Sequence, residues 1–169
     1  MFSNLQVNIN NFPKIENIEF KAIHQNYLKV ILLNILLFLL LIIVAFSTIY
    51  FASNKIPQEI NLAYAITGII ILFSLIAFYF YIGFSRRKYA LREKDISYKS
   101  GVFTKTITTV PFNRIQHVEI DEGLFSRIFK LASINIFTAG AQGADLSIKG
   151  ISKEKANYIK EYITNIINE

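Results

Sequence analysis

Cysteine is absent from this chain of 169 residues, and histidine occurs only at His24 and His117. Without a thiol the protein forms no disulfide, and thiolate catalysis and thiolate metal sites are excluded. Neither histidine has a second histidine or a carboxylate at ligand spacing on an obvious helix face, so the sequence predicts no metal site and no cofactor. No serine has a partnered histidine, and Asp121, Glu122 and Asp145 are typical of turns and surfaces. We therefore expect a protein that is not an enzyme.

Charge is almost missing from two long apolar runs, 28–51 and 60–84. The first contains only Lys29, at its edge, and the second contains no charged residue. Each run is roughly 25 residues long, and a helix of that length, about 37 Å, crosses a hydrocarbon core of about 30 Å with some tilt. The runs lack the alternation of barrel strands, and only helices or closed barrels satisfy the backbone inside a bilayer. Because the linker between them is short, the sequence predicts a transmembrane helical hairpin.

Asp, Glu and His are absent from both runs, which argues against a transporter or an intramembrane hydrolase. Small and polar residues instead recur every three or four positions: Asn34, Ala45 and Thr48 in the first run, and Ala63, Thr67, Ser74 and Ala77 in the second. If these faces meet, Thr48 lies opposite Ala63 and Asn34 lies level with Ser74, with hydrogen bonds across the interface. The alternative is that such residues are simply tolerated in lipid.

Basic residues flank the hairpin before its first helix and after its second. Lys14, Lys21 and Lys29 precede or begin the first run, and Arg86, Arg87, Lys88, Arg92 and Lys94 follow the second. The connecting loop carries one Lys and one Glu. Since positive charge near the ends of spans stays in the cytoplasm, we expect a multi-pass protein of the cell (cytoplasmic) membrane with both termini cytoplasmic.

The polar remainder divides into a cytoplasmic N-terminal segment, 1–27, and a cytoplasmic domain, 86–168, on either side of the hairpin, 28–84. Apolar residues alternate with polar ones after residue 86, in the manner of half-buried strands separated by turns. We expect six or seven short antiparallel strands, one helical turn near Leu124, and a final helix with an apolar stripe at Ala156, Ile159, Ile163, Ile166 and Ile167. For 14–27 two alternatives remain open: a strand that joins the sheet, or a short interfacial helix.

Two elements carry a family resemblance. Residues 111–118 form a Pro-x-x-Arg-Ile-Gln-x-Val element, and 131–140 form a Leu-Ala-x-Ile-x-Ile-x-Thr-Ala-Gly element. Together with the two preceding spans, they resemble the membrane-flanked bacterial pleckstrin-homology-like family, also called YdbS-like. The resemblance implies an α+β membrane protein with a small antiparallel PH-like β-barrel closed by a C-terminal α-helix. Lys130 departs from the pattern, because the family often has Gly before Leu-Ala. The resemblance brings no ligand and no catalytic residues with it.

Our leading hypothesis is a non-enzymatic, membrane-tethered interaction module at the cytoplasmic face, which binds a protein partner or self-assembles. Arg114, Gln116 and Arg127 are the candidates for a partner surface, although hydrogen bonds that tie loops together are the simpler role for them. The alternative is a lipid-binding or lipid-transfer component of a membrane complex.

Arg86, Arg87 and Lys88 are the candidates for contact with anionic lipid headgroups. Almost no linker separates them from the second run, so they should lie at headgroup depth in the lipid bilayer. The net charge of +6 has its main excess close to this span, which does not favour nucleic acid as a partner.

Overall fold

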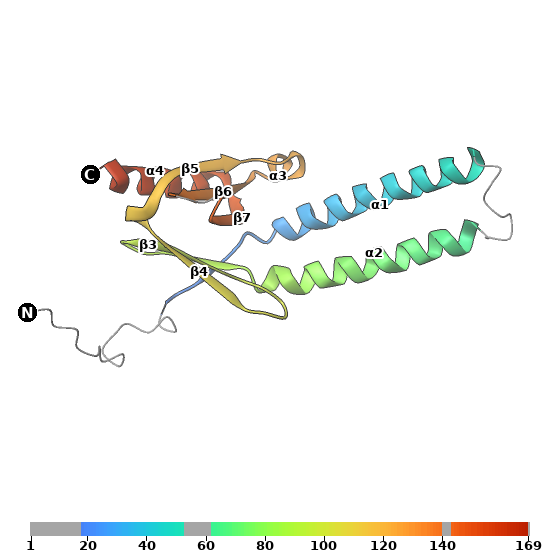
Figure 1. Cartoon of the computed structure of the whole chain (residues 1–169), viewed down its shortest axis with the longest axis horizontal. Helices are drawn as coiled ribbons and strands as arrows, with labels where there is room; N and C mark the ends of the chain where they lie inside the picture. Colours follow the sequence, from blue (N-terminus) through green and yellow to red (C-terminus); the bar gives the residue numbers. More distant parts are fainter. Residues whose placement is uncertain (1–17, 53–61, 140–142, 169) are drawn as a thin grey trace, which may run out of the picture.

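The computed structural model describes residues 18–52, 62–139 and 143–168, and two long helices dominate it (Figure 1). Helix α1 (Tyr27–Ala52) and helix α2 (Leu62–Ser85) run side by side away from a smaller domain of strands and helices. Both helices are long and apolar enough to cross a membrane. The ends that join the domain, the start of α1 and the end of α2, lie together at one end of the hairpin.

The contact face of the hairpin consists mainly of large side chains. The half-buried positions include Ile35, Leu39, Ile43 and Phe46 on α1, and Ile66, Ile69, Phe73 and Ile76 on α2. Asn34, Thr48, Thr67 and Ser74 are exposed, and each donates a hydrogen bond to a carbonyl three or four residues earlier in its own helix. The prediction that small and polar residues face the partner helix is therefore wrong for these four, although Ala77 of the predicted face is half-buried. A hydroxyl or amide that bonds within its own helix needs no partner across the interface.

The described part of the chain contains seven antiparallel strands in two sheets, and the six that follow residue 86 confirm the antiparallel strands expected there. The four-stranded sheet has the order β1 (Lys21–Ala22), β2 (Lys88–Leu91), β3 (Asp95–Ser100) and β4 (Thr106–Pro111). The three-stranded sheet has the order β5 (Ile115–Asp121), β6 (Leu131–Thr138) and β7 (Leu146–Ser152). Lys21 in β1 pairs with Tyr89 in β2, so the segment before the hairpin contributes a strand, and the hairpin is inserted between β1 and β2.

The expectation of a closed barrel is wrong, because the two sheets are not joined into one. Strand β4 ends at Pro111, which has no N–H to continue a ladder, and the 3₁₀ turn Phe112–Arg114 then carries the chain to the other sheet. On the opposite side β1 is only two residues long. There the described link is one backbone hydrogen bond of 2.8 Å, from His24 N–H to the Gly150 carbonyl in β7.

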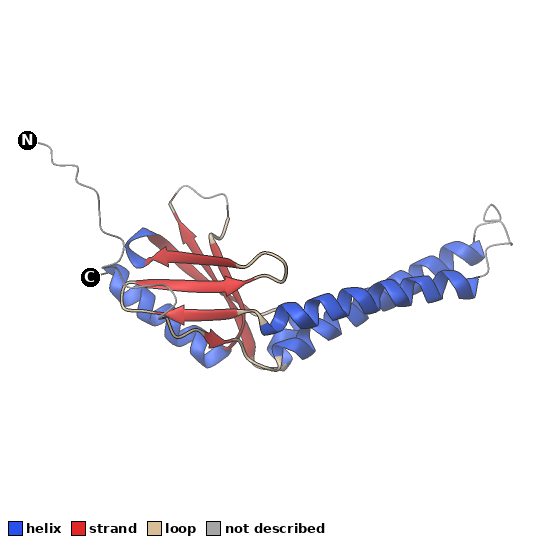
Figure 2. Cartoon of the chain, turned by 90° about the horizontal axis from the view of Figure 1, so that it is seen from below, coloured by secondary structure: helices blue, strands red, loops and turns tan. Residues whose placement is uncertain are grey.

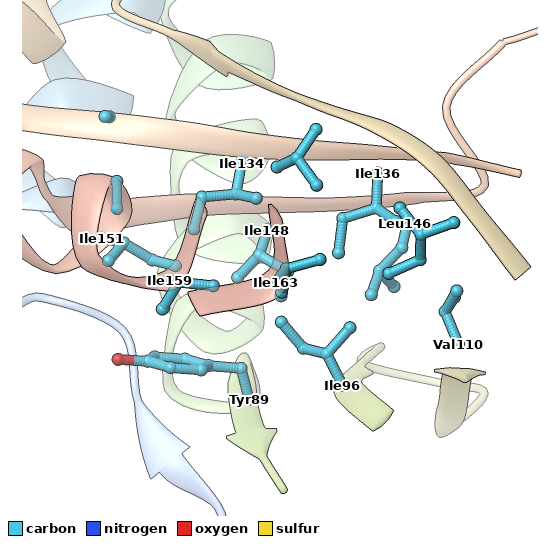
Figure 3. Close-up of a cluster of buried hydrophobic side chains, with 14 of the residues drawn as sticks. Tyr89, Ile96, Val110, Ile134, Ile136, Leu146, Ile148, Ile151, Ile159 and Ile163 are labelled. Carbon is cyan, nitrogen blue, oxygen red and sulfur yellow. The ribbon is translucent and has the colours of Figure 1, made fainter. Parts of the chain in front are cut away.

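The C-terminal helix α4 (Lys153–Asn168) lies against the strands (Figure 2), and one core of apolar side chains fills the space between the sheets and this helix (Figure 3). Ile96 and Val110 of the first sheet meet Ile134 and Ile148 of the second, and Ile163 of α4 is fully buried among them. The stripe expected on the final helix is confirmed at Ala156, Ile159 and Ile163, which are buried, and Ile166 packs against the same core, whereas Ile167 at the end of the helix is exposed. The short helix α3 (Leu124–Ile128), expected as one turn, lies between β5 and β6 and packs near the start of α1.

The motif that begins at Pro111 positions the chain between the two sheets. Phe112, Ile115 and Val118 are buried, whereas Arg114 and Gln116 are exposed. At the other motif, Lys130 has a φ of 54°, in the left-handed region where glycine is favoured. The departure from the family pattern therefore falls on a residue whose backbone conformation suits Gly.

Candidate functional site

Helix α2 passes into strand β2 through two residues, so the predicted basic triplet lies at the junction of hairpin and domain. The Arg86 and Arg87 N–H groups still donate to the Gly83 and Phe84 carbonyls, at 3.2 and 3.1 Å. Arg86 and Lys88 are exposed, whereas Arg87 between them is half-buried. The alternation of an extended chain thus turns Arg87 inward and its two neighbours outward.

Aromatic rings, rather than carboxylates, surround the Arg87 side chain. Its guanidinium carbon lies 6.0 Å from the centroid of the Tyr27 ring, a cation–π distance. Burial raises the pKa of the nearby Tyr98 phenol above its ordinary value, and the positive charge of Arg87 opposes that shift. No Asp or Glu in the described ranges forms a salt bridge with Arg87. A half-buried cation without an anionic partner is the main electrostatic feature of this junction.

A cavity of about 330 Å³ opens beside Arg87, between the end of α2, the β3–β4 turn and strand β7. It is lined by Tyr79, Phe80, Gly83, Arg87, Tyr98, Ser100, Gly101, Val102, Ser147 and Lys149. Two cations and several hydroxyl groups therefore share one cavity, and none of the described residues that line it is a carboxylate. Such a set of donors suits an anion with several oxygen atoms, such as a phosphate group.

Gly101 shapes the mouth of this cavity. Its φ is 110°, and a Cβ placed on it would lie 1.8 Å from the Thr104 carbonyl oxygen. Only glycine fits this turn. The turn in turn brings Val102 against α2, where it lies 3.2 Å from the position that a Cβ on Gly83 would occupy.

Further basic residues line a smaller recess next to the cavity. Arg86, Lys88, Lys99 and Lys105 line this recess, of about 180 Å³, and we call these four residues the basic rim. Lys88 and Lys99 are direct cross-strand partners in the β2–β3 register. Like charges directly opposite each other on a sheet destabilise it. An anion bound between Lys88 and Lys99 would reduce this repulsion.

The candidates for a partner surface do not come together. Arg114 ends the 3₁₀ turn before β5 and Gln116 lies at the start of that strand, whereas Arg127 follows the end of the strand, in α3. Seven strand residues at about 3.3 Å each put about 23 Å along the sheet between the two ends. Arg127 instead lines a separate cavity, which also contains Glu122 and Lys153, and these two form a salt bridge of 2.7 Å.

Sequence reasoning found Arg86, Arg87 and Lys88 but missed Lys99, Lys105 and Lys149. Each of the missed lysines stands in or beside a strand where polar residues are expected to face solvent, so nothing local distinguishes them. Only the sheet topology, which puts β3 and β7 at the end of α2, brings them near the junction. Within 18–52, 62–139 and 143–168, no cluster of three or more His, Asp or Glu residues could hold a metal ion.

Comparison with known proteins gives a consistent assignment. The sequence model of a family described as Bacterial PH domain matches residues 20–166, which include both long helices. The "UPF0699 transmembrane protein YdbS" of Bacillus subtilis (strain 168) is 30% identical over 79 residues. That alignment covers 47% of this chain and 48% of the relative, so the chain spans about half the length of the curated relative that it matches. No solved structure matches the chain significantly.

Proposed function

The chain belongs to the bacterial PH domain family, and on that premise we propose that it is a non-enzymatic membrane module that binds anionic phospholipid headgroups. Its hairpin holds the PH-like domain against the bilayer, on the cytoplasmic face if positive charge determines the orientation. The observation that carries the proposal is the cavity beside Arg87, which contains a half-buried cation with no carboxylate partner in the described residues.

The location of the cavity favours a lipid over a soluble anion. Tyr79, Phe80 and Gly83, which line one wall, belong to the last two turns of α2. The phosphate of a lipid at the polar end of the cavity would therefore be within reach of Arg87 and Lys149. The acyl chains of that lipid would extend along the apolar surface of α2. Guanidinium groups bind phosphate oxygens in a bidentate manner, and serine and tyrosine hydroxyls supply further donors.

The basic rim has a different role in this proposal. Its four side chains are exposed or half-buried, and each is worth about 1 kcal/mol near an anionic surface, less after screening by salt. The rim therefore raises the local concentration of anionic lipid without selecting one headgroup. Selection belongs to the cavity.

Lipid that co-purifies with the protein in mild detergent tests this division, with mass spectrometry as the measurement. The wild-type protein should retain anionic over zwitterionic lipid in 0.5 M salt. Arg87→Gln, and separately Lys149→Gln, should lose that retention, and Arg87→Lys should restore part of it. The matched control, Arg86→Gln with Lys88→Gln, should retain lipid at high salt, and changing Arg86, Arg87 and Lys88 together should abolish the preference there.

Equal retention of anionic lipid by the wild type and by Arg87→Gln at high salt would overturn the headgroup site. Circular dichroism and the unfolding temperature of each variant check that the domain stays folded. Titration with inorganic phosphate distinguishes the sources of the anion. Displacement of lipid at millimolar phosphate would show a site for a soluble phosphate, and resistance to it supports a lipid site.

A protein partner is the second candidate, and the edge of strand β4 favours it. In the described part of the chain, β4 is the last strand of its sheet, and Thr106, Ile107 and Thr109 on it are exposed. An unpaired edge that is rich in β-branched residues accepts an extended peptide as an additional strand. Ile107→Lys should then remove a co-purifying protein but leave lipid retention unchanged. A partner that Ile107→Lys still retains would exclude this edge.

A further inference from the structure

The turn between β3 and β4 extends beyond the body of the domain and lies against α2 (Figure 1). At its tip the Phe103 ring stacks on Tyr79, with ring centroids 6.0 Å apart and 23° between the ring planes. Phe103 is nevertheless 89% exposed, the largest exposed fraction among the large hydrophobic residues that the structure describes. An aromatic ring is thus held at the outside of the molecule, next to a helix that is apolar enough to span a membrane.

The contact with Tyr79 defines the depth of the tip. Tyr79 precedes the end of α2 at Ser85 by six residues, which is about 9 Å along a helix axis. The first charged residue after Tyr79 is Arg86. If Arg86 lies among the headgroups, Phe103 lies deeper than the headgroups and reaches the acyl chains.

The charges near the tip fit the same depth. Lys105 follows Phe103 by two residues, and Lys88 and Lys99 lie behind it in the basic rim. An apolar tip with cations just behind it matches the order of a bilayer, hydrocarbon first and anionic headgroups next.

A second apolar element flanks the hairpin on the side of α1. Helix α3 packs near the start of α1, where Lys29 lies 6.0 Å from the Phe129 ring. Leu124 and Ile128 in α3 are 75% and 68% exposed. Figure 1 shows α3 and the β3–β4 turn at the same level along the hairpin, one on each side of it.

We propose that the β3–β4 tip and α3 form a membrane-inserted collar around the hairpin, with Phe103 and Ile128 as its two lipid contacts. The occupant is the bilayer that contains the hairpin, because both elements continue the apolar surface of α1 and α2 at the point where the helices meet the domain. Two contacts on opposite sides prevent the domain from tilting. The collar requires only hydrocarbon and is independent of the headgroup site.

The chain contains no tryptophan, so a single introduced Trp reports on one position. The experiment compares Phe103→Trp and Ile128→Trp with the control Tyr158→Trp, which is on α4 and 65% exposed, in the full-length protein reconstituted in vesicles. The vesicles contain phosphatidylcholine with or without bromine at acyl carbons 6 and 7. Brominated lipid should quench the emission of the first two variants at least twofold and leave that of Tyr158→Trp unchanged.

If brominated lipid leaves the emission of Phe103→Trp and Ile128→Trp unchanged, the collar proposal is wrong. This holds whether the introduced Trp rings lie in water or against another protein. Quenching should persist when Arg87→Gln is added to Phe103→Trp, and its loss there would show that insertion depends on the headgroup site. Unfolding temperatures close to that of the wild type verify that each Trp variant is folded.

Discussion

Gly150 couples the first helix to the second sheet at the level of a single residue. Its φ is 81°, and a Cβ on it would lie 2.4 Å from Cγ of Tyr27, the first residue of α1. Its carbonyl also accepts the hydrogen bond from His24. The close approach of β7 to the start of the hairpin therefore requires glycine.

Replacement of Gly150 by alanine should destabilise the domain by about 2–4 kcal/mol, because a strained left-handed conformation adds to an overpacked contact. Thermal unfolding in detergent, followed by circular dichroism, measures the loss. Gly68→Ala is the matched control: apart from the chain neighbours and the backbone of the same helix, no described atom lies within 4 Å of a Cβ at that position, and alanine favours a helix. Equal unfolding temperatures for the two variants would contradict this account of Gly150.

Lys130 offers a change in the opposite direction. Its left-handed φ of 54° costs roughly 1 kcal/mol for a residue with a side chain. Lys130→Gly removes this cost but gives the unfolded chain more freedom, so we expect a net gain of at most about 1 kcal/mol. Lys130→Val should destabilise the domain, since β-branched residues tolerate this conformation least. Chemical unfolding of the three proteins gives the order, and a Val variant as stable as the Gly variant would refute it.

Among the elements, the hairpin shows what a sequence determines and what it leaves open. The length and the lack of charge of the two runs were enough to predict α1 and α2, because a bilayer accepts few other structures. Their contact faces were not predictable from small residues alone. Thr48, Thr67 and Ser74 satisfy their hydroxyl groups within their own helices, so no energetic requirement directs them toward the partner helix.

The observed contact faces predict which substitutions in α1 and α2 change the stability of the hairpin. Asn34→Leu and Ser74→Leu should change the stability of the hairpin by less than about 0.5 kcal/mol, because both side chains are exposed on the helices. Phe73→Ala, at a half-buried position, should lower it by about 1 kcal/mol or more, since packing drives helix association in lipid. Unfolding by sodium dodecyl sulfate in mixed micelles measures both effects. A larger loss for Ser74→Leu than for Phe73→Ala would restore the original assignment of the faces.

The strands were predictable from alternation, but the relation between the sheets was not. Ile96 and Ile148 alternate with polar neighbours in the same way, and no local signal says that their strands belong to different sheets. The same applies to the site. Arg87 follows a span and was found for that reason, whereas Lys149 belongs to β7 and reaches the cavity only through the topology. The motif made Arg114 and Gln116 candidates for a site. Their buried neighbours Phe112 and Ile115 instead hold the chain where it passes from one sheet to the other.

For the whole molecule, the orientation in the membrane stays a prediction that labelling can test. The chain has no cysteine, so single Cys variants need no further changes. Asn54→Cys, at a position outside the described residues, should react with an impermeant thiol reagent in intact cells. Tyr158→Cys, exposed on α4, should react only after the cells are opened. Labelling of Tyr158→Cys in intact cells would place the domain on the outer face.

The insertion of the hairpin between β1 and β2 also sets an order for biogenesis. The ribosome releases β1 first, but the partner strand β2 is synthesised only after both spans. If a single span entered the membrane, β1 and β2 would lie on opposite sides of the bilayer, and the four-stranded sheet would lack its first edge strand. The four-stranded sheet can therefore be completed only after both helices have been inserted. A chain that fails this step exposes the unpaired edge of β2, and such edges pair with other chains, while chaperones and proteases remove chains that are not folded.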